Sequence, residues 1–354
     1  MNVLLFSRYG SLGASSRIRT HQYFGELAAN GIHVTTSVLL DDAYLESLYA
    51  TGRKRTSQVA SRYARRMADL VRVARYDLIW IEKELFPGLP AWAERMLSLC
   101  RVPYVVDYDD AVFHHYDLHR KSAVRWLLGR KVDRVMRGAA TVVVGNEYLA
   151  QRARDVGARC IEIVPSAVDC RTYSIPERQE NVPPVIGWIG TPITSRYLAA
   201  IDEALAEVCR GDRARVVLVG AASKAVKRVE AEIRPWSRGT EVSDVQSFDI
   251  GIMPIPDAPW ERGKCGYKLI QYMACGRAVV ASPVGANRSI LAGEASGVLA
   301  SSPDEWVQAL SLLRDDAELR TKMGIAGRRR VEQSYCTSVT GPRLVEILRR
   351  SRKA

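Results

Sequence analysis

Short apolar runs alternate with longer segments of helical periodicity along the first half of the chain. The runs that predict strands cover residues 3–6, 32–36, 77–81, 104–107, 141–144 and 161–164. Their apolar residues are mostly consecutive, without strict alternation with polar ones, which is typical of parallel strands covered on both faces. A helix over about residues 16–30, ended by Gly31, is predicted between the first two strands. The first half therefore predicts a doubly wound α/β domain.

A polar, proline-rich segment at residues 176–184 separates this series from a second one. The second set of predicted strands covers residues 185–190, 216–220, 250–254, 278–281 and 297–300. We therefore expect an α/β protein with two tandem Rossmann-like, doubly wound domains. The expected parts are residues 1–178, residues 179–336, and a basic C-terminal helix at residues 337–354 that packs back toward the first domain. Ligands of such sheets bind at the carboxyl ends of the strands, so the expected site is the cleft between the domains.

The loop at residues 10–17 has the composition of a phosphate-binding turn. It follows the first predicted strand, opens the first predicted helix and is rich in glycine and serine. Small residues let backbone amides approach a phosphate, and a helix N-terminus favours negative charge. Arg17 and Arg19 add fixed positive charge. An ordinary strand-to-helix turn with a serine N-cap is the alternative.

Two lysines form a second candidate phosphate site. Lys264 and Lys268 are four residues apart in a glycine-rich segment that follows the strand predicted at residues 250–254. If a helix begins before them, they share one face near the positive end of its dipole. Their mutual repulsion is then relieved by an anion, and two lysines suit a diphosphate. A solvated helix face is the alternative.

A resemblance to a known family rests on the segment that follows these lysines. Residues 271–285, Gln-Tyr-Met-Ala-Cys-Gly-Arg-Ala-Val-Val-Ala-Ser-Pro-Val-Gly, resemble the donor-site motif of glycosyltransferase family 4. Residues 10–31, 164–169 and 186–192 resemble the family's N-terminal loop and helix, the turn before its linker and the start of its C-terminal domain. The resemblance implies the GT-B fold and the transfer of a sugar from a nucleotide-sugar, with retention of anomeric configuration and without a metal. The donor is then expected on the second domain and the acceptor on the first.

The donor-site pattern of the family is altered in this sequence. Gln271 stands where the family has a glutamate that binds the ribose hydroxyls, and an amide can still accept and donate hydrogen bonds. Gly263 stands where the family has a glutamate that contacts the donor sugar, and Glu261 is the candidate replacement. Thr191 and Arg196 take the places of the family's arginine and lysine.

The resemblance and the residue patterns together give a set of donor-side predictions. The leaving diphosphate carries charge that the enzyme must neutralise, and we expect Lys268 and Arg196 to do this as catalytic residues. The expected donor-binding residues are Gly13, Ser15, Gly190, Thr191, Arg196, Glu261, Lys264, Tyr267, Lys268 and Gln271.

Three carboxylates, Asp107, Asp109 and Asp110, follow one another at the end of the strand predicted at residues 104–107. The family usually has a histidine facing the acceptor here, and the resemblance aligns it with Asp109. A carboxylate at this place orients an acceptor hydroxyl or takes its proton. A metal site is the rival interpretation, although neither the family nor the spacing demands one. The expected acceptor-side residues are Arg17, Asp109, Asp110 and His114, with Asp109 catalytic.

Positive charge is concentrated in two stretches of the first half. The 354 residues include 51 Lys and Arg against 39 Asp and Glu, a net charge of +12. Residues 53–75 hold eight basic residues and one acid, and residues 120–137 hold seven and one. The second stretch also contains Trp126, Leu127 and Leu128, a combination typical of helices that bind an anionic membrane surface. Solvated helix faces are the alternative. Aromatic residues do not interleave regularly with the basic ones, so no nucleic-acid partner is expected.

Composition narrows the class of protein. Apolar residues make up 47% and charged residues 25% of the chain, which excludes a disordered tail, a fibre and a disulfide-knotted peptide. No apolar run approaches the roughly 20 residues that span a bilayer, and the N-terminus does not read as a signal peptide. The seven cysteines are scattered and favour the cytoplasm. The expected location is the cytoplasm, with peripheral binding to the inner face of the membrane.

Three hypotheses of function follow. The first is a retaining glycosyltransferase that moves a sugar from a nucleotide-diphosphate-sugar to a lipid-linked or saccharide acceptor, in surface-polysaccharide or glycolipid synthesis, without cofactor or metal. The second is a nucleotide-sugar epimerase or hydrolase of the same fold, which the missing acid at Gly263 keeps open. The third is a non-catalytic protein that binds polyanions through its basic surface.

Overall fold

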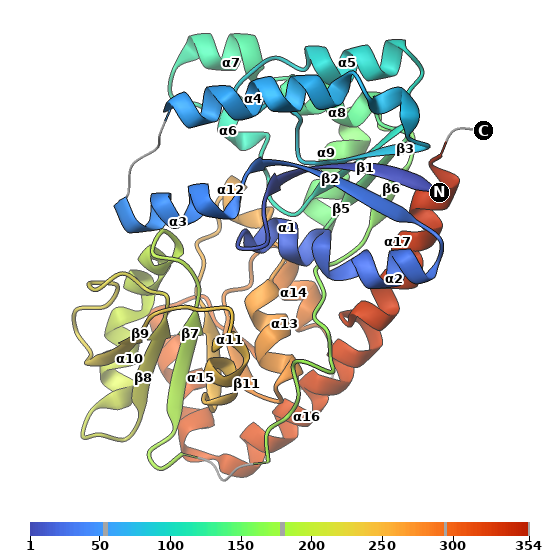
Figure 1. Cartoon of the computed structure of the whole chain (residues 1–354). Coiled ribbons are helices and arrows are strands. Elements are labelled where there is room, and N and C mark those ends of the chain that lie inside the picture. The colour runs from blue at the N-terminus through green and yellow to red at the C-terminus, as the bar shows by residue number, and fades with distance from the viewer. Residues whose placement is uncertain (52–55, 178–180, 294–295, 353–354) are drawn as a thin grey trace. The chain divides into compact units, whose positions relative to one another are not determined.

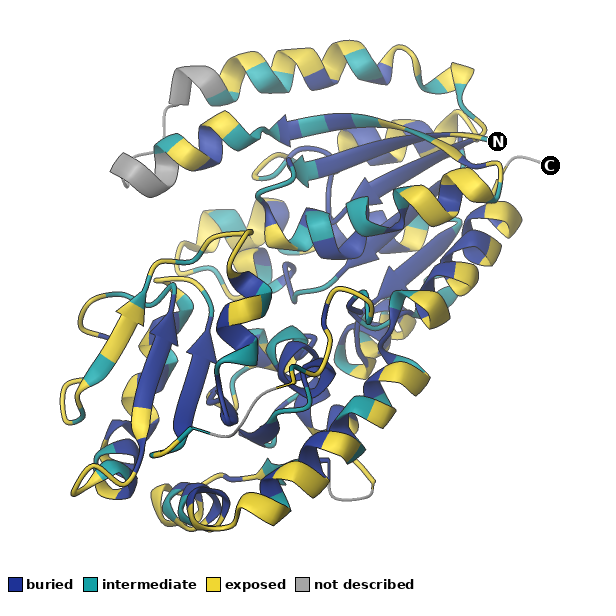
Figure 2. Ribbon diagram, turned by 60° about the horizontal axis from the view of Figure 1, so that its bottom comes forward, coloured by how far each residue is buried: buried dark blue, intermediate teal, exposed yellow. Residues whose placement is uncertain are grey.

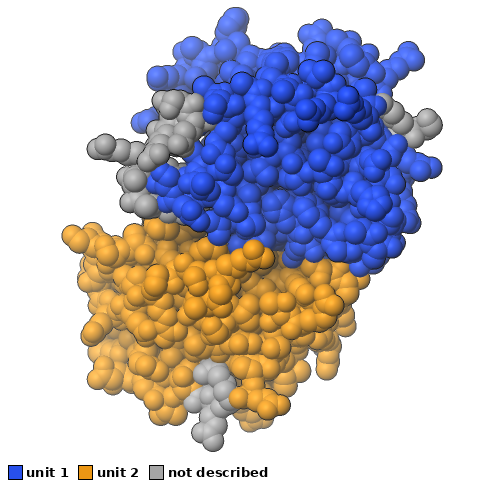
Figure 3. Space-filling view, in the orientation of Figure 1, with its two compact units in different colours: residues 1–166, 263–265, 340–354 blue, residues 167–262, 266–339 orange. Residues whose placement is uncertain are grey.

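The computed structural model describes residues 1–51, 56–177, 181–293 and 296–352. The contacts within the chain divide it into two compact units (Figure 3). Unit 1 contains residues 1–166, 263–265 and 340–354, and unit 2 contains residues 167–262 and 266–339. The first change of unit falls between residues 166 and 167, before the boundary at residue 178 that the polar segment predicts. Residues 178–180 of that segment lie outside the described residues.

Unit 1 is built on a six-stranded parallel sheet with the strand order β2-β1-β3-β4-β5-β6 (Figure 1). The strands are β1 (Asn2–Tyr9), β2 (His33–Leu40), β3 (Leu78–Glu82), β4 (Tyr104–Tyr108), β5 (Thr141–Val144) and β6 (Ile161–Ile163). Strands β3, β4 and β5 are buried along their whole length, as their mostly apolar sequences predict (Figure 2). The strand order changes direction between β1 and β3, so their carboxyl ends form the place where doubly wound sheets bind ligands.

Helices surround the sheet of unit 1, and one of them comes from the end of the chain. They are α1 (Ala14–Arg19), α2 (Phe24–Ala29), α3 (Asp42–Thr51), α4 (Thr56–Leu70), α5 (Trp92–Leu99), α6 (His114–Asp117), α7 (Ser122–Leu128), α8 (Lys131–Gly138), α9 (Glu147–Asp155) and most of α17 (Thr337–Arg350), with 3-10 turns η1 (His21–Tyr23) and η2 (Val73–Arg75). Leu344 and Leu348 of α17 are buried in the same core as Val3 and Leu5 of β1. Helix α17 therefore completes the hydrophobic core of unit 1.

Unit 2 has a second parallel sheet of six strands in the order β12-β11-β10-β7-β8-β9. The strands are β7 (Val185–Ile189), β8 (Arg215–Val219), β9 (Ala231–Arg234), β10 (Ile250–Met253), β11 (Ala278–Ala281) and β12 (Val298–Leu299). Here the order changes direction between β7 and β10, so the carboxyl ends of these two strands mark the expected ligand edge.

The helices of unit 2 include the segment that carries the donor-site motif. They are α10 (Asp202–Cys209), α11 (Glu241–Gln246), α12 (Pro259–Arg262), α13 (Tyr267–Ala274), α14 (Ala286–Ile290), α15 (Pro303–Asp315), α16 (Ala317–Ser334) and the first residues of α17, with the 3-10 helix η3 (Thr194–Ile201). Leu269 and Ile270 of α13 are fully buried in one core with Ile189 of β7 and Val279 of β11. This packing fixes the start of α13 beside the ligand edge.

Two doubly wound parallel domains were predicted, and the two sheets confirm that fold class. The predicted helix over residues 16–30 is wrong in one respect, because the structure breaks it into α1, η1 and α2. The break falls at Thr20, whose hydroxyl donates to the carbonyl of Ser16 and competes with the backbone bonds of a continuous helix. Strand β9 was not predicted, since its four residues lie at an edge and are half exposed.

Candidate active site

A buried carboxylate in unit 2 lies beside an exposed arginine. Glu261 of α12 is almost fully buried, and its Oε1 accepts a hydrogen bond from the hydroxyl of Tyr197 in η3. The guanidinium of Arg196 lies 3.9 Å from the same oxygen and stacks over the Tyr197 ring at 5.1 Å. These residues follow β7 and β10, the two strands at which the sheet order changes direction. The structure therefore brings the predicted residues Glu261 and Arg196 together at the ligand edge.

Lys268 lies in the first turn of α13, in the same unit. Its ammonium is 5.4 Å from the centre of the buried Trp188 ring. Gly190 follows Trp188 at the end of β7, and a side chain there would approach Lys268 Cε to about 3.0 Å. Thr191 is exposed in the turn before η3, and its carbonyl accepts bonds from the amides of Thr194 and Ser195. A lysine near the positive end of a helix dipole is favourable when an anion binds there.

Gln271 lies deeper in α13, within a buried hydrogen-bond network. Its amide nitrogen donates to the hydroxyl of Tyr173 at 2.8 Å and to Glu241 Oε1 at 3.1 Å. The other oxygen of Glu241 accepts from the indole of Trp236. Tyr267 is the first residue of α13 and also interacts with Tyr173. The pKa of Tyr173 is raised, and the largest cause is its burial. A ribose bound at Gln271 would thus meet its amide oxygen, since the nitrogen already has two acceptors.

Lys264 does not share a helix face with Lys268, so that prediction is wrong. Helix α13 begins only at Tyr267, after Gly266 in the left-handed conformation at φ 65°. Residues 263–265 instead belong to unit 1, where the amide of Asn146 donates to the Lys264 carbonyl at 3.0 Å. The ammonium of Lys264 pairs with Asp110 Oδ1 at 3.4 Å.

The loop at residues 10–17 already holds an anion from its own chain. The amides of Ser11 and Leu12 donate to the carboxylate of Asp42, the first residue of α3, at 3.2 and 2.9 Å. Gly10 permits this approach, because a Cβ there would lie 2.4 Å from Asp42 Oδ1. The prediction that this loop cradles a phosphate is therefore wrong for these two amides. Burial alone would raise the pKa of Asp42, but these hydrogen bonds outweigh it and lower the pKa.

The end of this loop lies against the aspartates of β4. Gly13 is the N-cap of α1 and packs against the side chain of Tyr9. Ser15 donates its hydroxyl proton to Asp109 Oδ2 at 2.6 Å, so this predicted donor residue lies in the acceptor-side cluster. Arg17 is partly buried in α1.

Asp109 forms an ion pair with a residue that the sequence analysis missed. The ammonium of Lys83 lies 2.8 Å from Asp109 Oδ1, 3.9 Å from Asp110 Oδ2 and 3.1 Å from the Ser15 hydroxyl. Burial would raise the pKa of Asp109, but Lys83 and the Ser15 hydrogen bond lower it to about 2. A carboxylate that stays ionised to this pH is a poor base, so the geometry favours orientation of a hydroxyl over removal of its proton.

Other buried charges of unit 1 have partners of their own. Arg19 forms a two-pronged ion pair with Asp107, and Lys131 pairs with Glu84 at 2.5 Å. Glu82, the last residue of β3, accepts from the hydroxyl of Ser16 at 2.6 Å. Glu82, Lys83 and Glu84 are three consecutive charged residues, a pattern common in exposed turns. In the structure all three side chains are buried at the end of β3, next to β4.

His114 is held by its neighbours. One ring nitrogen lies 2.8 Å from Asp117 and the other lies 2.9 Å from the Tyr148 hydroxyl. His115 is the more exposed of the two, and the charges of Arg8, Glu84, Asp110 and Lys83 act on it. Partial burial, followed by the charge of Arg8, lowers the pKa of His115. The charge of Asp110 acts on His115 in the opposite direction and raises its pKa, though less than burial lowers it.

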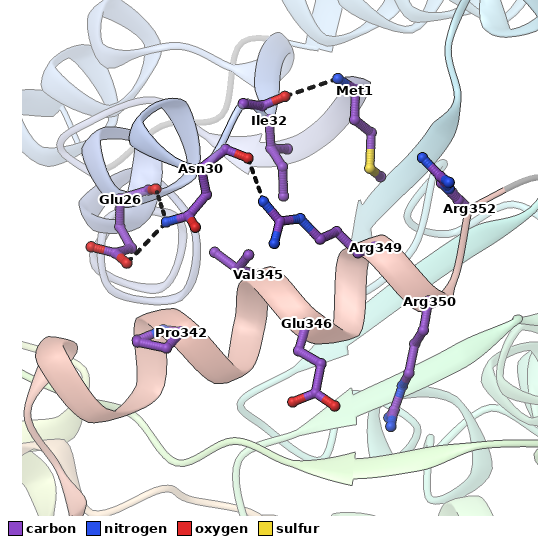
Figure 4. A pocket seen from close by; sticks show the side chains of 11 residues that line it. Met1, Glu26, Asn30, Ile32, Pro342, Val345, Glu346, Arg349, Arg350 and Arg352 are labelled. Carbon is purple, nitrogen blue, oxygen red and sulfur yellow. Dashed lines mark hydrogen bonds between the residues drawn. The ribbon is translucent and has the colours of Figure 1, made fainter.

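A metal site and a surface cavity are two further places where the described residues could bind a ligand. Within those ranges, no group of three or more His, Cys, Asp or Glu side chains is arranged to hold a metal ion. A cavity of about 750 Å³ in unit 1 is lined by Glu26, Asn30, Arg349 and Arg352, among others (Figure 4). It also touches Met1 and Ile32, which precede β1 and β2, so it lies at the amino edge of the sheet. The chemistry of the aspartate cluster lies at the opposite, carboxyl edge.

Two known families match the chain, one in each half of the sequence. Residues 16–167 match the family described as glycosyl transferase 4-like domain, and residues 183–316 match glycosyl transferases group 1. No curated protein matches the sequence.

Solved structures share the fold over almost the whole chain. Sucrose-phosphate synthase from Thermosynechococcus elongatus is 14% identical, with a TM-score of 0.73 over 99% of this chain and 98% of that chain. HepE from Anabaena, solved with UDP-glucose, is 14% identical, with a TM-score of 0.73 over 98% and 99%. An α-glucosyltransferase solved with UDP and a 13-mer DNA is 13% identical, with a TM-score of 0.63 over 98% and 99%. At these identities the likeness shows the fold.

The two sheets and the two family matches define a glycosyltransferase of the GT-B class. Within that class, the chain belongs to the glycosyltransferase family 4-like proteins.

Proposed function

We propose that this glycosyltransferase moves a sugar, with retention of anomeric configuration, from a nucleotide-diphosphate-sugar to a saccharide or lipid-linked acceptor in surface-polysaccharide or glycolipid synthesis. The supporting observation is the cluster of Glu261, Tyr197 and Arg196 at the ligand edge of unit 2. It lies within the residues that match glycosyl transferases group 1. UDP and UDP-glucose are bound in solved structures of similar fold, which makes a uridine nucleotide the first donor to test.

The donor-side roles follow from charge and burial. Arg196, whose side chain is 66% exposed, and Lys268 neutralise the diphosphate as the bond to the sugar breaks. Glu261 is fixed by Tyr197 and contacts the donor sugar in place of the acid missing at Gly263. Gln271 accepts from a ribose hydroxyl through its amide oxygen. No step needs a metal, so added EDTA should leave turnover unchanged.

The acceptor-side roles belong to unit 1. Asp109 and Asp110 lie at the carboxyl end of β4, next to the loop that opens α1. Both lie within 4 Å of a lysine ammonium, and Lys83 lowers the pKa of Asp109. Ionised carboxylates accept hydrogen bonds from sugar hydroxyls and orient them.

An exposed apolar and basic helix supports a membrane-bound acceptor. Trp126 of α7 is 87% exposed and Leu127 is also exposed, among the exposed side chains of Arg120, Lys121 and Arg125. Residues 52–55 of the other basic stretch lie outside the described residues. Among the helices of the described ranges, none is long and apolar enough to cross a membrane. We therefore propose that α7 inserts its apolar side chains into an anionic surface where the acceptor lies.

Nucleotide release tests the proposed function. The purified protein is incubated with UDP-glucose and other nucleotide-sugars, with and without octyl glycosides as acceptors. Release that requires an acceptor, with an α-linked product from an α-linked donor by NMR, supports the proposal. Conversion of donor without an acceptor would identify an epimerase or hydrolase instead. Absence of donor binding, with binding to polyanions such as heparin or DNA, would leave a polyanion-binding protein.

A further inference from the structure

Lys83 has a strained backbone conformation, and its side chain is directed toward Asp109 and Asp110. Lys83 has φ 65°, a left-handed value that is uncommon for any residue but glycine. The amide of Glu84 donates to the carbonyl of Glu82 at 2.8 Å across it, which closes a γ-turn of the rare type. The amide of Lys83 donates to the carbonyl of Asp107 at 2.9 Å and ties the turn to β4. Such strain persists only where surrounding contacts enforce it, and it clusters at functional sites.

This turn places the Lys83 ammonium between two neighbouring carboxylates of unequal availability. Asp109 is the less accessible of the two: its side chain is only 12% exposed, its Oδ2 accepts from Ser15 at 2.6 Å, and its Oδ1 is fully buried 2.8 Å from the Lys83 ammonium. Asp110 is 25% exposed, and its oxygens lie 3.9 Å from Lys83 and 3.4 Å from Lys264. An ionised carboxylate has about four acceptor positions. Two long contacts leave Asp110 more acceptor capacity than Asp109 has.

We propose that Asp110 is the carboxylate that binds a hydroxyl group of the sugar acceptor, and that Lys83 is the residue that positions it. This inference rests on the proposed function and changes the assignment within it. Asp109 becomes an anchor for Lys83, and Lys264 holds Asp110 from the other side. The exposed member of the cluster, Asp110, is a carboxylate, which repels anions and accepts hydrogen bonds from hydroxyl groups. The ligand recognised here is therefore a neutral, polyhydroxylated group.

The charges around the two aspartates make the inference testable by pH. Without Lys83, the buried Asp109 has no cation beside it and repels its neighbour Asp110, which keeps Lys264. Asp109 takes up a proton as the pH falls, and this relieves the repulsion. The sign is that the loss of affinity for the acceptor is largest at high pH and smaller at low pH. The other titratable or charged groups that act on Asp109 or Asp110 are Glu82, Asp107, Arg19, Cys265, Lys264 and His115.

Saturation-transfer NMR with methyl β-D-glucopyranoside, in the presence of UDP, measures the binding directly. We expect wild-type protein to bind this probe and Asp110→Asn to bind it at least tenfold more weakly, because a hydrogen bond to a charged group is lost. Lys83→Met should bind the probe at least tenfold more weakly than the wild type at pH 8 and should regain part of this affinity at pH 5; the wild type has the same His115 and corrects for its titration. The double variant Lys83→Met/Asp109→Asn, which has no unpaired buried carboxylate at position 109, should again follow the wild-type pH profile.

A buried lysine with another partner provides the control. Lys131 pairs with Glu84 and donates to the carbonyl of Phe86. Lys131→Met should lower the melting temperature but keep the wild-type pH profile of probe binding. Unchanged affinity in Asp110→Asn, or no binding by the wild type, would overturn the inference. Wild-type protein that binds the probe but transfers no sugar from any donor would instead contradict the proposed function.

Discussion

Lys268 is the single side chain on which the donor assignment depends most. It lies in the first turn of α13, above the buried ring of Trp188. We expect Lys268→Ala to weaken UDP binding about tenfold or more, because a charge-assisted contact to phosphate is removed. Isothermal titration at fixed ionic strength measures this. Lys322→Ala removes an exposed lysine of α16 that pairs with Glu318, and it should bind UDP like the wild type. Unchanged affinity in Lys268→Ala would remove this lysine from the site.

Asp42 sets the conformation of the first loop, and its removal has a predictable cost. Asp42→Ala leaves the amides of Ser11 and Leu12 without their carboxylate, so we expect a loss of about 1–3 kcal/mol in the free energy of unfolding. The pKa of Asp42 is lowered in the folded state, so its stabilisation is present above the unfolded pKa and fades as the pH falls. Urea unfolding at pH 7 and pH 3 should show a smaller difference at pH 3, which lies below the unfolded pKa. Glu46→Gln, an exposed change on the same helix, should have no such effect.

For single site residues, the sequence shows which neighbours stand next to them in the chain but not which distant residues they contact. Asp109 and Asp110 were predicted because three acids follow one strand, which is a local signal. Lys83 and Asp42 were missed because their partners are distant in the chain and are met only through the pairing of β1 with β2 and β3, and of β3 with β4. Lys264 was misplaced because the left-handed Gly266 delays the start of α13.

Helix α7 is the element that binds the membrane surface in our proposal. Burying Trp126 in lipid stabilises the bound state by roughly 2 kcal/mol. We therefore expect Trp126→Ser to weaken binding to vesicles with equal phosphatidylglycerol and phosphatidylcholine by about tenfold or more, measured by cosedimentation. Leu312→Ser replaces an equally apolar exposed residue of α15 in unit 2 and should bind as the wild type does. Equal binding of both variants, or binding to pure phosphatidylcholine, would contradict the role of α7.

Elements were predicted best where burial alone decides them. The strands β3, β4, β5, β10 and β11 are buried throughout and consist mostly of apolar residues. Strand β9 escaped because an edge strand gains its hydrogen bonds from β8 without needing apolar side chains. The first helix was drawn too long because the pattern does not show that Thr20 bonds back to Ser16.

Each unit of the whole molecule packs its own hydrophobic core against its own sheet. Leu348 of α17 is fully buried in the core of unit 1, so Leu348→Ala should cost that unit about 2–5 kcal/mol. UDP binds unit 2 in our proposal and should stabilise that unit by mass action. Hydrogen exchange followed by mass spectrometry tests both. We expect Leu348→Ala to speed exchange in β4 and UDP to slow it in β11; the reverse pattern would contradict this division.

Gly263 has a consequence for the substitutions that this chain tolerates. Its Cα lies so close to Ala111 that a Cβ would fall 2.5 Å from the Ala111 methyl and 2.6 Å from the Ala111 backbone nitrogen. Part of this clash is with backbone, so no replacement at position 111 removes it. A protein engineer cannot introduce glutamate at position 263 unless the whole segment shifts. A donor-side acid therefore has to come from another position, such as Glu261.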